Sequence, residues 1–81
     1  MEIKDFVQRG KESFDKKDYK SAEKYLRKAY KMDSRYADVL NMLGVICQGK
    51  GDYDEAMNFF QKALKINPNY TEAMLNLAVL Y

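Results

Sequence analysis

Two features of the sequence could support chemistry on a phosphate or a thiol. The spacing Gly-x4-Gly-Lys, with which a phosphate-binding loop begins, occurs at residues 44–50. Gly51 then stands where that loop needs Ser or Thr to hold a magnesium ion. Cys47 is the single cysteine, and the chain has no histidine that could activate it as a nucleophile. We therefore expect residues 44–50 to serve packing and Cys47 to be a buried structural thiol.

Two further features could support acid–base chemistry or modification. Carboxylates cluster at Asp52, Asp54 and Glu55, but a predicted helix begins there and its dipole favours negative charge. The segment at residues 69–71 has the spacing of a glycosylation acceptor, and we expect it to begin a helix instead, since no secretory signal precedes it. We predict no catalytic residue, no metal ligand and no cofactor, and we do not expect an enzyme.

The composition is typical of a small soluble protein. Of the 81 residues, 47% are hydrophobic and 32% are charged, and no stretch approaches the roughly 20 apolar residues that span a membrane. The N-terminus has no apolar run after a basic start, and one cysteine suits a reducing compartment, so we expect a cytoplasmic protein. A net charge of +2 predicts neither a membrane nor a nucleic-acid partner by itself.

The sequence repeats itself at a fixed interval, the one that separates Gly10 from Gly44. We call this separation the repeat interval. The other identical pairs at this interval are Lys16 with Lys50, Asp18 with Asp52, Tyr19 with Tyr53, Ala22 with Ala56, Lys28 with Lys62, Ala29 with Ala63, Lys31 with Lys65 and Tyr36 with Tyr70. A third, incomplete copy begins near Thr71. Such self-similarity indicates a repeat protein.

Apolar residues within each copy follow helical spacing. Two stripes recur at i, i+3, i+4, i+7 and i+8, and they are Ala22, Tyr25, Leu26, Ala29 and Tyr30, and Ala56, Phe59, Phe60, Ala63 and Leu64. Glycines at 49 and 51 and the proline at 68 interrupt the pattern. We predict helices at about 3–16, 20–32, 37–49, 54–66 and 71–81. Asp52 with Glu55, and Asn69 with Glu72, are predicted capping pairs.

These features resemble the tetratricopeptide repeat, whose signature reads Trp-x2-Leu-Gly-x2-Tyr, then Ala-x3-Phe, then Pro. In the second copy its positions hold Leu40, Leu43, Gly44, Cys47, Ala56, Phe60 and Pro68. The resemblance implies an all-α fold of antiparallel helix hairpins stacked as a right-handed solenoid of about two and a half repeats. We expect one domain over residues 1–81, with repeats at 3–36 and 37–70 and the first helix of a third at 71–81. Its glycines and alanines should let paired helices approach closely.

One helical stripe is not explained by packing. On the first helix of each repeat it comprises Lys4, Val7, Lys11, Phe14, Asp38, Asn41, Val45, Gln48, Glu72, Leu75 and Val79. The resemblance implies that this face lines a concave groove for a peptide or helix of a partner protein. A mixed solvated face is the alternative.

The resemblance also bears on the ligand. Family members that bind the acidic tails of heat-shock chaperones use a carboxylate clamp, and its positions here hold Val7, Lys11, Met42, Glu72 and Asn76. Because Glu72 would repel a carboxylate, we do not expect such a tail. We expect an amphipathic or mixed ligand that meets Val45 and Leu75 at the centre and Lys4 and Lys11 at one edge.

Two alternative functions stay open. The last helix is predicted to leave an apolar patch uncovered, which either a longer array or self-association would cover, and it comprises Met74, Leu77, Ala78, Leu80 and Tyr81. A basic ridge that could contact RNA phosphates or an acidic protein comprises Lys20, Lys24, Arg27, Lys28 and Lys31. We expect this ridge to be a solvated convex face, since acidic residues flank it and no aromatic residue interleaves with it for base stacking.

The first repeat departs from the second on one face. Arg9, Glu12 and Ser13 stand where the second repeat has Leu43, Ile46 and Cys47. We expect this polar face where no neighbouring hairpin covers the first one.

Overall fold

The second repeat shows how the sequence begins and ends its helices. In the computed structural model, which describes residues 2–81, α3 spans Ala37–Gly49 and α4 spans Tyr53–Ile66. Between them Gly51 has a φ of 85°, a left-handed conformation that glycine adopts without a steric penalty. The helix α4 ends just before Asn67, where the following proline disfavours helical geometry.

The remaining helices follow the same plan. The helix α1 spans Ile3–Asp15, α2 spans Tyr19–Met32 and α5 spans Thr71–Leu80. Every bound lies within one residue of its predicted position. All regular structure within residues 2–81 is α-helical, so the predicted all-α fold is confirmed. None of these helices is both long and apolar enough to cross a membrane.

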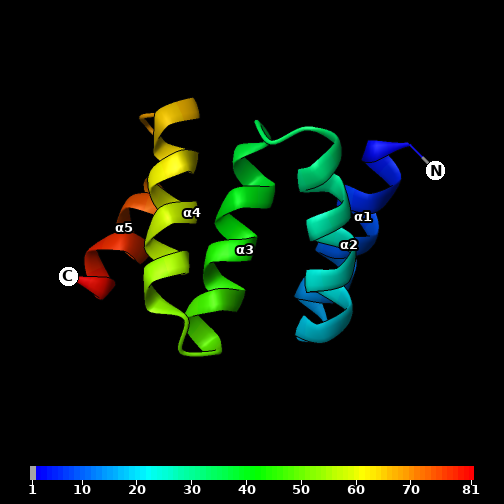
Figure 1. The fold of residues 1–81 in the computed structure, drawn as a ribbon, viewed down its shortest axis with the longest axis horizontal. Helices are drawn as coiled ribbons and strands as arrows, with labels where there is room; N and C mark the ends of the chain where they lie inside the picture. The colour runs from blue at the N-terminus through cyan, green and yellow to red at the C-terminus, as the bar shows by residue number, and fades with distance from the viewer. Residues whose placement is uncertain (1) are drawn as a thin grey trace.

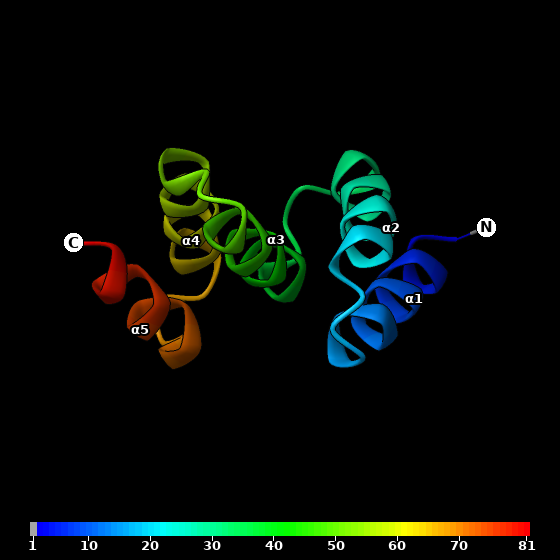
Figure 2. The same ribbon diagram turned by 90° about the horizontal axis from the view of Figure 1, so that it is seen from below.

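The helices pack as successive hairpins. Helix α1 packs against α2, α3 packs against α4, and α5 packs against α4 and contacts α3. The hairpins follow one another along the longest dimension of 36 Å, with the two termini at opposite ends (Figure 1). Figure 2 shows the two helix pairs end-on, with α5 beside the second pair. The contact between α2 and α3 joins one hairpin to the next.

Glycine lets the paired helices approach closely. A methyl group placed on Gly44 would lie 2.5 Å from Cε1 of Phe60, and one placed on Gly10 would lie 2.6 Å from Cδ2 of Leu26. Both neighbouring side chains are fully buried. The expected role of small residues is therefore confirmed at the same position of both hairpins.

The predicted capping pair of Asp52 with Glu55 is wrong. The Asp52 side chain makes no hydrogen bond to the start of α4. The carboxylate of Glu55 instead accepts hydrogen bonds from Arg27 and Cys47. A tertiary ion pair is thus formed in place of the local cap.

The predicted pairing of Asn69 with Glu72 is also wrong. The helix α5 begins directly after Tyr70, and no side chain caps it. Tyr70 therefore holds the cap position, and Asn69 lies one residue before it. The backbone N–H of Asn69 donates a hydrogen bond to Oδ1 of Asn67 in the preceding turn. Proline at 68 fixes this turn.

Candidate functional site

One depression collects residues from three helices of the predicted groove stripe. It lies between α1, α3 and the start of α5 and has a volume of about 190 Å³. Six stripe residues line it, namely Lys11, Phe14, Asp38, Asn41, Val45 and Glu72. Three residues outside the stripe complete the lining, namely Asp15, Met42 and Tyr70. We call this surface the groove depression.

The repeat itself brings these side chains together. Lys11 and Val45 occupy the same position of successive repeats, as do Asp38 and Glu72. Stacking one hairpin on the next places equivalent positions side by side, so a stripe on the first helix of each repeat becomes a continuous lining.

Hydrogen bonds fix the polar part of the groove depression. Asn41 is only 4% exposed, and its Oδ1 accepts a hydrogen bond of 3.2 Å from Nδ2 of Asn76. The Tyr70 hydroxyl donates a hydrogen bond of 2.9 Å to Oδ1 of Asp38. Burial, and then the neighbouring Asp38 carboxylate, raise the pKa of Tyr70 above its ordinary value. Tyr70 therefore stays a neutral donor that holds Asp38 in place.

The groove depression is acidic around an apolar floor. Phe14, Val45 and Met42 supply apolar surface. The lining also contains one lysine, Lys11, and three carboxylates, those of Asp15, Asp38 and Glu72. This balance disfavours an acidic ligand and favours a positively charged one.

Sequence reasoning missed Asp15 and Tyr70, and it named Met42 only as a position of the carboxylate clamp. A stripe drawn on the first helices does not include Tyr70, which precedes α5. The identity of Tyr36 with Tyr70 at the repeat interval was the available signal.

The other five stripe residues lie outside the groove depression. Lys4 forms an exposed ion pair with Glu2 at 3.6 Å, and Val7 packs against the core. Gln48 is half-buried. Leu75 and Val79 on α5 are 64% and 74% exposed. The predicted stripe thus divides into the residues that line the groove depression and the residues that lie outside it on α1, α3 and α5.

Cys47 lies at the junction between the hairpins. Its side chain is fully buried, and Sγ donates a hydrogen bond of 3.1 Å to Oε1 of Glu55. Burial, and then the Glu55 carboxylate, raise the pKa of Cys47 to about 12. The thiol therefore stays protonated and is a poor nucleophile, as expected for a structural cysteine.

Ion pairs across the same junction join α2 to the second hairpin. Arg27 Nη2 lies 2.8 Å from Glu55 Oε1, and Arg27 Nε lies 2.9 Å from Glu23 Oε2. Lys50 Nζ lies 3.2 Å from Glu23 Oε2. Lys50, the last residue of the phosphate-loop spacing, is therefore used in packing two hairpins together.

The predicted basic ridge needs correction. Arg27 is held at the junction by two carboxylates and does not belong to an outward ridge. No aromatic residue was expected to interleave with the ridge, yet two rings lie beside its lysines. The Lys24 amine lies 6.0 Å from the ring centroid of Tyr25, and the Lys28 amine lies 5.6 Å from that of Phe6. A lysine of the same molecule thus lies over one face of each ring.

The predicted self-association patch on α5 is only partly uncovered. Met74 and Tyr81 are 51% and 79% exposed, and Ala78 is also exposed. Leu77 and Leu80 pack partly against the core. The Tyr81 hydroxyl accepts a hydrogen bond from the side chain of Gln61 in α4.

Comparison with known families agrees with this architecture. Residues 37–70 match one sequence model described as tetratricopeptide repeat, and residues 6–36 match a second model with the same description. A comparison with curated proteins found no match. Repeats of this kind are in general protein–protein interaction modules, and the proteins that carry them are typically non-enzymatic. With paired helices recurring at the repeat interval and both hairpins matched, the chain belongs to the tetratricopeptide repeat family.

Proposed function

We propose that this chain binds a segment of a partner protein in the groove depression. The observation that carries the proposal is the convergence of three helices on it. Lys11 comes from α1, Val45 from α3 and Glu72 from α5. Lys11 and Glu72 place charged groups beside the apolar side chain of Val45, a combination that suits recognition of a mixed ligand segment.

The shape favours side chains of a peptide over an enclosed small molecule. A volume of about 190 Å³ is below the range of about 300–1,000 Å³ that is usual for small-molecule pockets. An apolar side chain of the partner would contact Phe14 and Val45. A neighbouring lysine or arginine would face Asp15 and Glu72, and an acidic residue would pair with Lys11.

A selection experiment tests the proposal. Peptides that bind the protein would be selected from a library of peptides of about 15 residues, a length that can bind as an extended segment or as a short helix. The affinities of the selected peptides would then be measured for two variants. Val45→Arg fills the floor of the groove depression and should weaken binding at least about tenfold. Val79→Arg makes the same change on the exposed part of the stripe and should leave affinity within about threefold. Equal affinity of both variants would exclude the groove depression as the site.

The exposed surface of α5 supports a second candidate, self-association. Met74, Leu75, Val79 and Tyr81 are all more than half exposed, and exposed apolar patches mark interaction surfaces. Sedimentation velocity over a range of concentrations would detect a dimer that Met74→Glu abolishes. A monomer at every concentration would rule out this candidate.

A further inference from the structure

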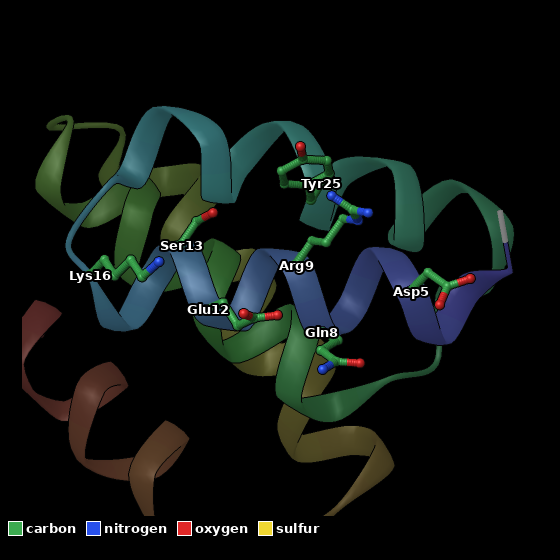
Figure 3. A pocket seen from close by; sticks show the side chains of 7 residues that line it. All are labelled: Asp5, Gln8, Arg9, Glu12, Ser13, Lys16 and Tyr25. Carbon is green, nitrogen blue, oxygen red and sulfur yellow. The ribbon is translucent and has the colours of Figure 1, made fainter.

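A second and larger depression lies on the outer face of the first hairpin. It has a volume of about 460 Å³ and is lined by Asp5, Gln8, Arg9, Glu12, Ser13, Lys16 and Tyr25. Figure 3 shows these side chains along α1, with Arg9 extending toward Tyr25 of α2. We call this surface the N-terminal notch. It shares no residue with the groove depression.

The repeat explains where the notch lies. Moved by one repeat interval, its positions become Val39, Met42, Leu43, Ile46, Cys47, Lys50 and Phe59. All of these except Lys50 are at most 7% exposed. On the second hairpin, this surface receives α2 of the hairpin before it. The notch is therefore the equivalent of an established helix-docking surface.

The contacts of α2 on the second hairpin show what such a surface binds. Glu23 pairs with Lys50 at 3.2 Å. The Arg27 guanidinium lies 5.8 Å from the ring centroid of Phe59. The ring of Tyr30 packs edge-on against the same ring, with centroids 5.6 Å apart. Arg27 Nη2 also lies 2.8 Å from Glu55 Oε1. An acid, an arginine and a tyrosine on one helix face thus contact one lysine, one aromatic ring and one carboxylate.

The notch retains the lysine and the aromatic ring but not the carboxylate, since Ser21 stands at the position of Glu55. Lys16 stands at the position of Lys50, and Tyr25 at the position of Phe59. A docking helix with the same acid, arginine and tyrosine would therefore find a cation and an aromatic ring in the same register.

The notch differs from the second hairpin by being charged. Glu12 of the notch stands at the position of Ile46 on the second hairpin. There, Lys20 of α2 lies beside Ile46 in the cleft between α2 and α3. A lysine at the Lys20 position of a docking helix would thus face a carboxylate at the notch. Across the part of the chain that the structure describes, no ion pair engages Glu12, Arg9 or Lys16. These charges are available to an incoming partner.

We propose that the N-terminal notch binds an α-helix of a second polypeptide whose face carries Lys-x2-Glu-x3-Arg-x2-Tyr. Helix α2 has this pattern at Lys20, Glu23, Arg27 and Tyr30. A folded second copy does not supply it, because its own α2 is docked on its own second hairpin. The occupant that we propose is a helix of another protein with the same charge order.

A peptide with the sequence of residues 19–32 is the probe for this site. An isolated helix shorter than about 12–15 residues is marginal in water. The peptide would therefore be held helical by a cross-link between the positions of Lys28 and Met32, which lie away from the docking face. Fluorescence anisotropy should show saturable binding to the intact protein. The absence of saturation up to about 1 mM would overturn the proposal.

Charge exchange locates the contact. Lys16→Glu should weaken peptide binding roughly threefold to tenfold, and the peptide change Glu23→Lys should do the same. Combining the two should restore most of the affinity. Lys65→Glu, a matched change on exposed α4, should have no effect. If Lys16→Glu and Lys65→Glu weakened peptide binding equally, or if the combined changes did not restore affinity, a specific pair between Lys16 and Glu23 of the peptide would be contradicted.

Two further measurements separate this site from the others. Amide shifts in NMR spectra should change around Ser13, Lys16 and Tyr25 when the peptide binds. Shifts concentrated at Ile46 and Phe59 would mean that the peptide displaces α2 from the second hairpin, which would overturn the proposal. The protein with Val45→Arg should bind this peptide with unchanged affinity, because the notch shares no residue with the groove depression.

Discussion

Gly44 lies so close to the ring of Phe60 that no side chain fits between them. A methyl group on Gly44 would be 2.5 Å from Cε1 of the ring, and Phe60 is fully buried. Protein interiors have few voids into which a ring could move. The same relationship joins Gly10 to Leu26 in the first hairpin, so one contact fixes the helix spacing of both repeats.

Gly44→Ala should therefore destabilise the protein. Overpacking at this contact is expected to lower the free energy of unfolding by about 1–3 kcal/mol, measured by urea denaturation. Gly49→Ala is the matched control, since a methyl group there meets no atom within 4 Å. A Gly44→Ala variant as stable as the Gly49→Ala variant would contradict the assigned packing.

Lys17→Gly should stabilise the protein. Lys17 has a φ of 64°, and the equivalent residue of the second repeat is Gly51 with a φ of 85°. A left-handed residue with a side chain costs about 1–2 kcal/mol, whereas the extra freedom of glycine in the unfolded chain costs about 0.5–1 kcal/mol. The melting temperature should rise by a few degrees. A lower melting temperature would mean that Lys17 is unstrained.

Acid should weaken the junction between the hairpins. Partial burial raises the pKa of Glu23, but hydrogen bonds from Arg27 and Lys50 outweigh this effect and hold that pKa below its ordinary value. Hydrogen bonds from Cys47 and then Arg27 also lower the pKa of Glu55. Both carboxylates thus bind protons less readily in the folded chain than in the unfolded one. Their stabilisation is complete above the unfolded pKa of about 4.3 and is lost as the pH falls through the lower folded pKa.

Urea denaturation at a series of pH values checks this dependence. The chain with Glu23→Gln and Glu55→Gln should lose less stability between about pH 5 and pH 3 than the unaltered chain. The same acid loss in both proteins would show that the junction carboxylates do not contribute.

Cys47 should resist alkylation in the folded protein. Because its folded pKa of about 12 exceeds an unfolded value of about 8.5, the thiol ionises in the unfolded chain first. The stabilisation is complete below that unfolded value and is lost as the pH rises toward 12. Mass spectrometry at about pH 8.5 should show iodoacetamide labelling only as fast as the chain opens. Labelling at the rate of a free thiol would contradict burial.

The fold could be predicted from the sequence because its signals are local and repeated. Gly51 marks the end of α3 and Pro68 follows the end of α4, and both act through their own backbone geometry. Helical spacing of apolar residues placed every helix within one residue. The repeat interval indicated the hairpin order, because equivalent positions must repeat in space.

The junction could not be predicted in this way, because its contacts join residues far apart in the chain. Glu55 had the spacing of a local cap, yet a buried thiol and an arginine from the preceding hairpin bind it instead. Arg27 appeared to belong to a basic ridge for the same reason. Helical periodicity places a residue on a face and does not identify its partner from another helix.

The groove depression was predicted in part. Periodicity identified Lys11, Asn41 and Val45, which share one helical face. Tyr70 was missed because it lies in the turn before α5 and reaches Asp38 through its long side chain. Leu75 and Val79 share the same helical face, but on α5 they are exposed and lie outside the groove depression, which periodicity does not predict.

The most direct test of the central claim is an NMR map of the protein titrated with a selected peptide. If the groove depression is the binding site, amide shifts should change most around Phe14, Asn41 and Val45, and those around Lys65 on α4 should stay unchanged. Shifts confined to α5 or to α4, with none at Val45, would contradict peptide binding in the groove depression.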